Sequence, residues 1–566
     1  MRWLALCIAT AVVATLQTAV TAEAKSHHDE KISPALLALA LANPDADIPV
    51  IVRAGSATAK LHRSERAANA VTKAHGRVGR GLSIVGGVSG LLSGKEVLEL
   101  ADDSDIASVS LDEVVTATFD PTDGAALASS PGILEVGAPD VWRQLGVTGR
   151  GVGVAILDSG IAPHPDLAGR IVASIDFTGP VAGGELVAPA DPGGHGTHVA
   201  GLVAGDGTAS GGAYAGVAPG ANLVDVRVIA ANGSTNISTL VQGMQWVLAH
   251  REDYNIRVAN LSLGARATTS YRNDPLATAV EVLTFAGVAV VVSAGNEGPG
   301  ASTITTPGDD PFVITVGGID DSGTATPTDD ALASWSSRGV TQFDHLAKPD
   351  LVAPGRKVVS LRSPGSTLDR ELTDRLVAGL DPTAPAYFRL SGTSMAAPVV
   401  TGVVALMLER DPTLTPAQVK HRLTSTATPL AYGSPTTTGS GMVNAVAAVT
   451  DPDPGVDAIV APVSDGFASE MFSYLYGQPL VWRDPSFNRG VDSHGRSWSD
   501  VSWSNVIWDQ TTWANVSWAS FSWTSVTWQD IAWEDVTWED ITWDSLVRKD
   551  KDSKAKVKGS GWVAVN

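Results

Sequence analysis

Cysteine, basic residues and long apolar runs are all scarce in this sequence. One cysteine among 566 residues excludes an intramolecular disulfide and a thiolate metal cluster. Lys and Arg total 39 against 60 Asp and Glu. The resulting net charge of −21 argues against nucleic acid or an anionic membrane as the main partner, because clustered cations bind phosphates. Hydrophobic residues still make up 44% of the chain, too many for a disordered protein.

The N-terminal end, residues 1–24, has the pattern of a secretory signal peptide. Met1 and Arg2 precede an apolar run at 4–13, and small residues follow up to Ala24. Because the run is shorter than the roughly 20 residues of a membrane span, a signal peptide is favoured over a membrane anchor. Its removal also removes Cys7. We therefore expect a secreted, extracellular protein without cysteine, and attachment to the cell surface stays open.

Composition and periodicity divide the rest of the chain into five parts. Residues 25–125 show the short strands and helices of a small α+β domain, whereas residues 126–450 alternate buried-strand and helix patterns. The second pattern predicts an α/β fold, with a mostly parallel sheet and helices on both faces. The remaining parts are a linker at 451–497, tryptophan repeats at 498–547 and a charged tail at 548–566.

Individual elements can be predicted in both domains. In the small domain we expect strands at 48–52, 82–85, 88–92 and 106–111 and helices at 60–75 and 95–101. In the large domain we expect strands at 152–157, 222–228, 258–262, 288–292 and 312–316, with helices at 237–250 and 275–286. A stretch rich in Asp, Pro, Gly and Ala at 120–131 suits an exposed connector that proteases can reach.

Three motifs of the large domain carry side chains suited to nucleophilic catalysis. Asp158 ends a predicted strand and can accept a hydrogen bond from an imidazole N–H, which fixes the tautomer of the ring. His195 begins one helix of small residues. Ser394 begins another after Gly392, where unpaired N–H groups favour developing negative charge. Each alone has a plain structural interpretation, but together they predict a hydrogen-bonded row of carboxylate, imidazole and hydroxyl.

Asn296 and His198 lie close to these motifs. Asn296 is on a glycine-flanked loop after a predicted strand, where its amide can donate to an oxyanion; an ordinary turn asparagine is the alternative. His198 lies three residues after His195, a spacing that can hold a metal, but no Glu accompanies the pair as in a zinc protease helix. We therefore expect no metal ligands here and a packing role for His198.

The motifs resemble the signature blocks of the subtilisin-like, or subtilase, serine peptidases. The matching blocks are Asp158-Ser-Gly, His195-Gly-Thr-His-Val-Ala-Gly, Ala294-Gly-Asn and Gly392-Thr-Ser-Met-Ala-Ala-Pro398. They occur in the Asp, His, Ser order of that family, and the likeness spans residues 137–444. The resemblance implies a serine endopeptidase that hydrolyses peptide bonds in proteins through an acyl-enzyme.

The resemblance also implies a role for each residue of the catalytic site. Ser394 would attack the peptide carbonyl, His195 would carry the proton, and Asp158 would orient the imidazole. Asn296 would hold the oxyanion.

The resemblance further implies how substrate binds. A protein or peptide substrate would lie extended beside Ser262, Leu263 and Gly264 and pair with them as a strand. The segment at 360–388 is longer than in compact members of the family, so we expect a flap near the cleft and infer no pocket specificity from the family. No cofactor is required. A structural calcium ion is compatible with a cysteine-free extracellular member, although the acidic residues form no complete ligand pattern.

The region from Ile48 to Leu111 resembles, in element order and position, the ferredoxin-like inhibitory propeptide that precedes many such peptidases. A small domain that covers the sheet can assist a slow, non-local fold and block the cleft until it is cut. The resemblance therefore implies a zymogen with its own propeptide as intramolecular inhibitor. A permanently attached small domain is the alternative.

The tryptophan repeats form a separate module. Ten tryptophans recur every five residues from Trp498 to Trp543. This spacing fits neither one face of a helix nor one side of a strand, but it resembles the register of pentapeptide-repeat β-solenoids. An exposed tryptophan stripe would then bind polysaccharide or a cell surface by stacking. An extended segment lying over the peptidase and a flexible β-prone tail are the alternatives.

Two other functions compete with the peptidase. One is a catalytically inactive surface-binding or adhesion protein whose tryptophan repeat is the functional part. The other is an α/β-hydrolase esterase that uses Asp411 and His421, both downstream of Ser394.

Overall fold

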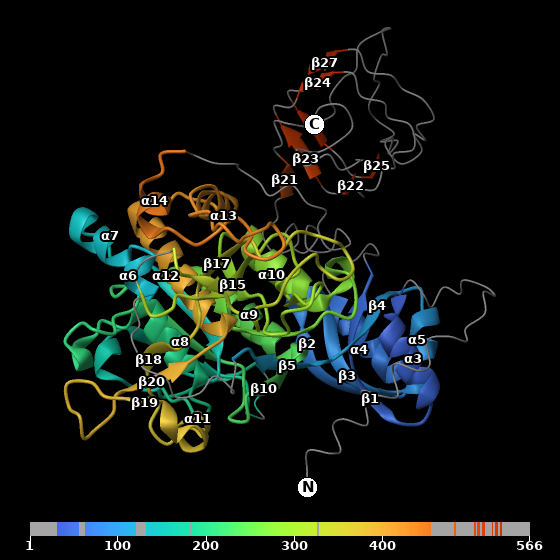
Figure 1. Cartoon of the computed structure of the whole chain (residues 1–566). Coiled ribbons are helices and arrows are strands. Elements are labelled where there is room, and N and C mark those ends of the chain that lie inside the picture. The colour runs from blue at the N-terminus through green and yellow to red at the C-terminus, as the bar shows by residue number, and fades with distance from the viewer. Residues whose placement is uncertain are drawn as a thin grey trace.

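The computed structural model describes residues 31–55, 63–119, 132–179, 181, 183–324 and 328–453, together with the backbone of seven short strands between residues 480 and 534. Figure 1 shows the described parts, which begin with a small domain at the N-terminal end and continue into a large one. The expected signal peptide, the connector at 120–131 and the charged tail lie outside the described residues. Within those residues, none of the helices has both the length and the apolar character that crossing a membrane requires.

The small domain is the α+β unit that the sequence predicts. Its antiparallel sheet has the strand order β2-β3-β1-β4. The strands are β1 (Asp47–Ala54), β2 (Arg77–Leu82), β3 (Gly87–Ser93) and β4 (Ile106–Leu111). The helices are α3 (Pro34–Ala42), α4 (Arg63–Lys73) and α5 (Gly94–Asp102).

The strand predicted at 82–85 is wrong. After β2, the chain forms a single 3₁₀ turn, η1 (Ser83–Val85), which ends at Gly86 in the left-handed conformation (φ 64°). The apolar side chains of Ile84 and Val85 are buried in the core shared with helices of the large domain and not in the small domain's own core. Their hydrophobicity therefore reflects contact between domains, which periodicity within a strand does not reveal.

The large domain is built on a nine-stranded sheet that is mostly parallel. Its order is β16-β15-β13-β11-β6-β9-β7-β8, with β17 paired to β15. The parallel strands are β6 (Gly153–Asp158), β7 (Ile171–Asp176), β9 (Asn222–Arg227), β11 (Ile256–Leu261), β13 (Ala289–Ser293), β15 (Ile314–Asp320) and β17 (Leu351–Pro354). Two short antiparallel strands, β8 (Glu185–Leu186) and β16 (Ala331–Leu332), close the edges.

Helices cover both faces of this sheet, as predicted (Figure 1). On one face α8 (His195–Ala204) and α12 (Thr393–Arg410) pack against Val154 and Ile156 of β6. On the other face α9 (Ile237–His250) packs against β6 and α10 (Pro275–Phe285) against β13, in one apolar core that also contains Ala155 and Leu157. Both faces of β6 are therefore buried, which explains its unbroken apolar sequence. The remaining helices are α6 (Gly132–Glu135), α7 (Ala138–Leu145), α11 (Thr367–Glu371), α13 (Pro416–Ser425) and α14 (Ala445–Thr450).

The small domain is anchored on the α9 and α10 side of the large domain. Arg53 is only 2% exposed, and its guanidinium donates to Thr278 Oγ1 of α10 at 3.0 Å. Asp112 accepts hydrogen bonds from the backbone N–H (2.9 Å) and the hydroxyl (2.7 Å) of Ser238, in the first turn of α9. One domain thus caps the N-terminus of a helix in the other.

The long segment at 360–388 belongs to a separate three-stranded sheet of β18 (Val358–Leu361), β20 (Tyr387–Leu390) and β19 (Leu376–Val377). Between these strands, Thr367 and Leu368 donate backbone hydrogen bonds to Pro192 O and Gly193 O. The segment therefore lies against the loop that leads into His195. These contacts support the loop, and the flap expected near the cleft stays a prediction.

The strands in the tryptophan repeat pair in parallel. They are β22 (Trp503–Ser504), β23 (Val506–Asp509), β24 (Thr512–Ala514), β25 (Trp523–Thr524), β26 (Thr527–Gln529) and β27 (Ala532–Glu534). One further strand, β21 (Leu480–Trp482), lies in the predicted linker and pairs in parallel with β23. Trp503 pairs with Trp523, Trp508 with Trp528, and Trp513 with Trp533. Within the repeat, paired residues are thus four five-residue units apart.

Candidate active site

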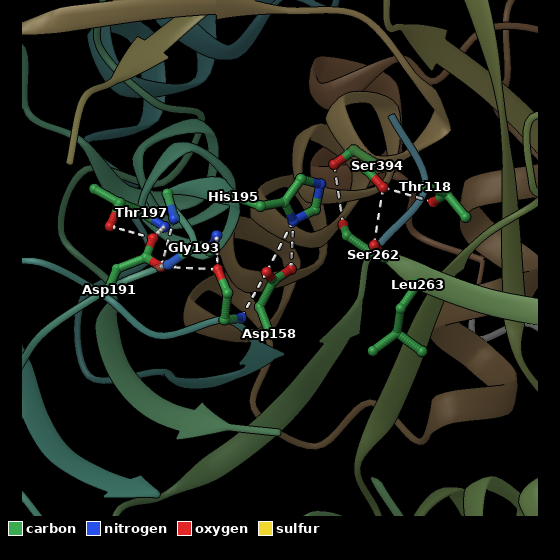
Figure 2. A network of polar contacts seen from close by, with 12 residues as sticks. Thr118, Asp158, Asp191, Gly193, His195, Thr197, Ser262, Leu263 and Ser394 are labelled. Carbon is green, nitrogen blue, oxygen red and sulfur yellow. Dashed lines mark hydrogen bonds and ion pairs between the residues drawn. The ribbon is translucent and has the colours of Figure 1, made fainter. Parts of the chain in front are cut away.

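Asp158 and His195 form a buried hydrogen-bonded pair (Figure 2). Asp158 is the last residue of β6, and His195 is the first residue of α8 after Gly194, whose φ of 97° makes a left-handed turn. His195 Nδ1 lies 2.8 Å from Asp158 Oδ1 and 3.0 Å from Oδ2. Burial by itself would lower the pKa of His195, but the Asp158 carboxylate together with Asp191 holds that pKa above its ordinary value. The pair is therefore suited to accept a proton at Nε2.

Ser394 lies at the start of α12, as predicted, but its hydroxyl is not bonded to His195. Ser394 Oγ donates to Ser262 O at 2.9 Å and lies 2.6 Å from Thr118 Oγ1 (Figure 2). The Nε2 atom of His195 is buried and has no hydrogen-bond partner among the described residues. The expected row of three groups is thus present as a carboxylate–imidazole pair, with the nucleophile turned toward other partners.

Asn296 presents an amide hydrogen-bond donor beside this serine. Its Oδ1 accepts hydrogen bonds from Thr393 N (3.0 Å) and Thr393 Oγ1 (2.9 Å), so its Nδ2 is directed the other way. That Nδ2 is buried without a partner. A Cβ atom at Gly392 would lie 3.1 Å from Asn296 Nδ2 and 2.6 Å from Thr118 O. The Asn296 amide nitrogen and the Thr118 carbonyl oxygen thus both lie next to Gly392. Ser394 N donates to Thr118 O at 3.3 Å.

A segment of the same chain lies beside these candidate catalytic residues. Strand β5 (Val114–Ala117) runs antiparallel to β12 (Leu263–Arg266) on one side and to β10 (Ser234–Asn236) on the other. Leu263 pairs with Ala117 and Gly264 with Thr116, while Thr118 N donates to Ser262 O at 3.4 Å. All three residues predicted to bind substrate, Ser262 through Gly264, therefore contact this segment in the extended manner expected for a substrate.

The peptide bond between Thr118 and Phe119 lies at the candidate catalytic groups. The carbonyl of Thr118 accepts from Ser394 N, and the Phe119 ring lies 5.9 Å from the His195 ring between centroids. Thr118, 9% exposed, also places its hydroxyl 2.9 Å from Ser293 Oγ. The sequence gives no local signal for these contacts, because residues 118 and 394 meet only through the fold.

Asp191 is a second site residue that the motifs did not reveal. Its carboxylate accepts hydrogen bonds from Ser159 Oγ (2.8 Å), Gly193 N (3.0 Å) and Gly194 N (2.7 Å), and from Thr197 N (2.8 Å) and Oγ1 (2.7 Å) (Figure 2). It thus ties the turn after Asp158 to the first turn of α8. Burial raises the pKa of Asp191, against the opposing effect of these donors. In the sequence, the only indication of this role is that Asp191 lies shortly before Gly193-Gly194-His195.

His198 packs, as predicted. Its Nε2 lies 3.0 Å from Phe388 O and 3.2 Å from Val358 O, and burial lowers its pKa to about 3. Among the described residues, no group of three or more His, Cys, Asp or Glu side chains is arranged to hold a metal ion.

The residues of the esterase alternative lie away from Ser394. Asp411 follows the C-terminal end of α12, whereas Ser394 is at its N-terminal end. A helix of 18 residues separates these ends by roughly 27 Å. Asp411 faces Arg422 at 3.7 Å and His421 faces Asp453 at 3.6 Å. The esterase interpretation is therefore wrong.

Comparisons with known proteins agree with this geometry. The model of the subtilase family matches residues 149–456. The chain is 40% identical to serine protease AprX of Bacillus subtilis over 351 residues, which are 61% of this chain and 75% of that protein. It is 34% identical to subtilisin E of the same species over 392 residues, 68% of this chain and 86% of the relative.

A solved structure is also similar. Fervidolysin from Fervidobacterium pennivorans, described as a keratinolytic enzyme related to subtilisin, matches with a TM-score of 0.53 and 25% identity. The match covers 72% of this chain and 61% of that one. On the family match and these identities, the chain belongs to the subtilase family of serine endopeptidases.

Proposed function

We propose that Asp158, His195 and Ser394 are the catalytic triad of this endopeptidase. Ser394 Oγ attacks the peptide carbonyl carbon while its proton passes to His195 Nε2. Asp158 stabilises the imidazolium that forms. The imidazolium then protonates the leaving amine as the C–N bond breaks, which leaves an acyl-enzyme. Water, activated by the same imidazole, hydrolyses the ester and restores Ser394.

The oxyanion of each tetrahedral intermediate is held by two N–H donors, Ser394 N and Asn296 Nδ2. The support for this assignment is the position of the Thr118 carbonyl, which accepts from Ser394 N at 3.3 Å and lies at the same glycine as the unpartnered Asn296 amide. Donors already in place need no reorganisation when negative charge develops. These groups supply every step without a cofactor.

The protein is made as an inhibited precursor, in which the N-terminal domain blocks the cleft. The observation that carries this proposal is the course of residues 114–118, which pair with β12 and β10 where an extended substrate would pair. The interface formed by Arg53 and Asp112 holds the domain in place after cleavage. The bond for self-cleavage is Thr118–Phe119, so the mature enzyme begins at Phe119, the residue directly before the connector.

The proposal is tested by expressing the full-length chain and its Ser394→Ala variant. The wild type is expected to hydrolyse casein and to yield a fragment with Phe119 at its N-terminus by mass spectrometry. S394A is expected to stay uncut at that bond and to leave casein intact. Casein hydrolysis by S394A at the wild-type rate would refute the triad. Active wild type cut elsewhere would refute the cleavage site alone.

We further propose export through the signal peptide and surface binding through the tryptophan repeat. The parallel pairing of residues four repeats apart supports a solenoid that exposes one side chain per repeat in a row. The test is the mass of both termini in the culture medium and co-sedimentation of the full chain with insoluble polysaccharide. A structural calcium ion is also a proposal, and a fall in Tm on adding EDTA would support it.

A further inference from the structure

The side chain of Thr118 contacts the hydroxyl of Ser293, the last residue of strand β13. Thr118 Oγ1 lies 2.9 Å from Ser293 Oγ and 2.6 Å from Ser394 Oγ. Ser293 is completely buried, and its hydroxyl also donates to Leu263 O at 3.3 Å. The residue on the N-terminal side of the proposed scissile bond is thus bound through its hydroxyl as well as its backbone.

The position of Ser293 is fixed by its surroundings. Its backbone belongs to the parallel ladder with β15, where it pairs with Val316. The neighbouring loop is filled by the buried side chain of Thr305, because a Cβ at Gly295 would lie 2.7 Å from that side chain and one at Gly264 only 2.5 Å away. The strand pairing and the hydrogen bond to Leu263 O therefore fix where the Ser293 hydroxyl lies.

We propose that Ser293 is a specificity-determining residue that selects substrates with a hydroxyl-bearing side chain, threonine above all, on the N-terminal side of the cut bond. The inference rests on the proposed function, in which residues 114–118 bind as a substrate does. Valine has the shape of threonine but would place a methyl group against a buried hydroxyl. Such a site disfavours the analogue that lacks the hydrogen-bonding group.

The expected preference is moderate. Without a partner on the substrate, Ser293 keeps its contact with Leu263 O, so the loss is that of one neutral hydrogen bond. This corresponds to roughly tenfold in kcat/KM between threonine and valine. Because the contact forms in the bound ground state, most of the difference is expected in KM.

The experiment compares two peptides, each followed by a chromogenic amide. Val-Thr-Ala-Thr has the sequence of residues 115–118, and Val-Thr-Ala-Val replaces its last threonine by valine. The enzyme is the full-length chain, purified after whatever processing it undergoes. Wild type is expected to prefer the threonine peptide by roughly tenfold. Ser293→Ala is expected to reduce the preference to within about twofold. Ser336→Ala is the matched control, since its buried hydroxyl accepts from Gly318 N and does not contact Thr118; it should keep the wild-type ratio.

Each outcome decides something. Equal rates for the two peptides in an active wild type overturn this inference and leave the proposed function standing. A tenfold preference that persists in S293A shows that another group selects the hydroxyl and overturns the assignment to Ser293. If neither the peptides nor casein are cleaved, both proposals fail. If S293A does not fold, inhibition of the wild type by the free acids of the two peptides decides, and equal inhibition constants overturn the proposal.

Discussion

Replacing Asp112 by alanine tests whether the N-terminal domain acts as a reversible inhibitor. Asp112 is 7% exposed and accepts two hydrogen bonds from Ser238 at the start of α9. The N-cap residue of this helix, Asn236, makes no capping hydrogen bond with its own side chain. Alanine therefore removes a helix cap that exists only while the domains are together. Loss of a cap costs about 1–2 kcal/mol, which weakens the inhibitor about 5–30-fold.

The assay is dilution of the processed full-length protein into a chromogenic peptide. Activity per mole of enzyme rises as the cleaved domain dissociates, and the midpoint of that rise reports the inhibition constant. For D112A the midpoint should move about 5–30-fold toward higher protein concentration. Asp105→Ala removes an exposed acid of the same domain and should leave it in place. An unmoved midpoint in a folded D112A would refute the reasoning.

The same assay has a predictable pH dependence. Burial raises the pKa of Asp112, although the Ser238 hydrogen bonds oppose this effect. A carboxyl whose pKa is higher in the complex than in the free domain favours the complex at low pH. That contribution is lost as the pH rises through the raised pKa. The wild-type midpoint should therefore move to higher protein concentration as the pH is raised from the ordinary carboxyl range, and D112A should show a smaller movement.

Three further predictions concern the site and its support. Asp158→Asn should lower kcat about 10⁴-fold, and it should shift the acidic limb of the pH–rate profile to lower pH, because the Asp158 charge raises the pKa of His195; an unmoved limb would contradict that cause. Asn296→Ala should lower kcat about 10²–10³-fold with little change in KM, as steady-state kinetics will show, and a pure KM effect would remove Asn296 from the oxyanion site. Burial and the neighbouring Asp330 raise the pKa of Glu135 to about 9, so thermal melts should show Tm falling as the pH rises from the ordinary carboxyl range toward 9. Glu135→Gln should weaken this dependence, and an unchanged slope would refute the assignment.

Much of the fold could be predicted because its signals are local. The helix predicted at 237–250 is α9 with the same bounds, and the apolar run at 152–157 is the central strand β6, shifted by one residue. For the strand that failed, the deciding contact was between domains. Residues 82–85 are apolar because Ile84 and Val85 pack against the large domain, and no strand pattern distinguishes this case.

The residues of the candidate site likewise fall into those that local motifs predict and those that only long-range contacts reveal. Asp158, His195, Asn296 and Ser394 were found because each lies in a distinctive local motif. Thr118 has no motif, and its role depends on strand β5 pairing with β12 far along the chain. Asp191 was missed because five hydrogen bonds, and not the residue type, make it part of the site.

Under the proposed function, the contacts of Thr118 also give a physical reason why a segment that binds like a substrate would inhibit. Attack requires a hydrogen bond from Ser394 Oγ to His195 Nε2, but in this arrangement the serine donates to Ser262 O and lies against the Thr118 hydroxyl, while Nε2 has no partner. The segment thus occupies the cleft and also engages the nucleophile. In the proposed mechanism, Ser394 Oγ has to turn from Ser262 O toward His195 Nε2 before it attacks, whereas the carbonyl of Thr118 already accepts from Ser394 N. Under the proposed function, inhibition and self-cleavage would therefore differ in the orientation of a single hydroxyl, that of Ser394.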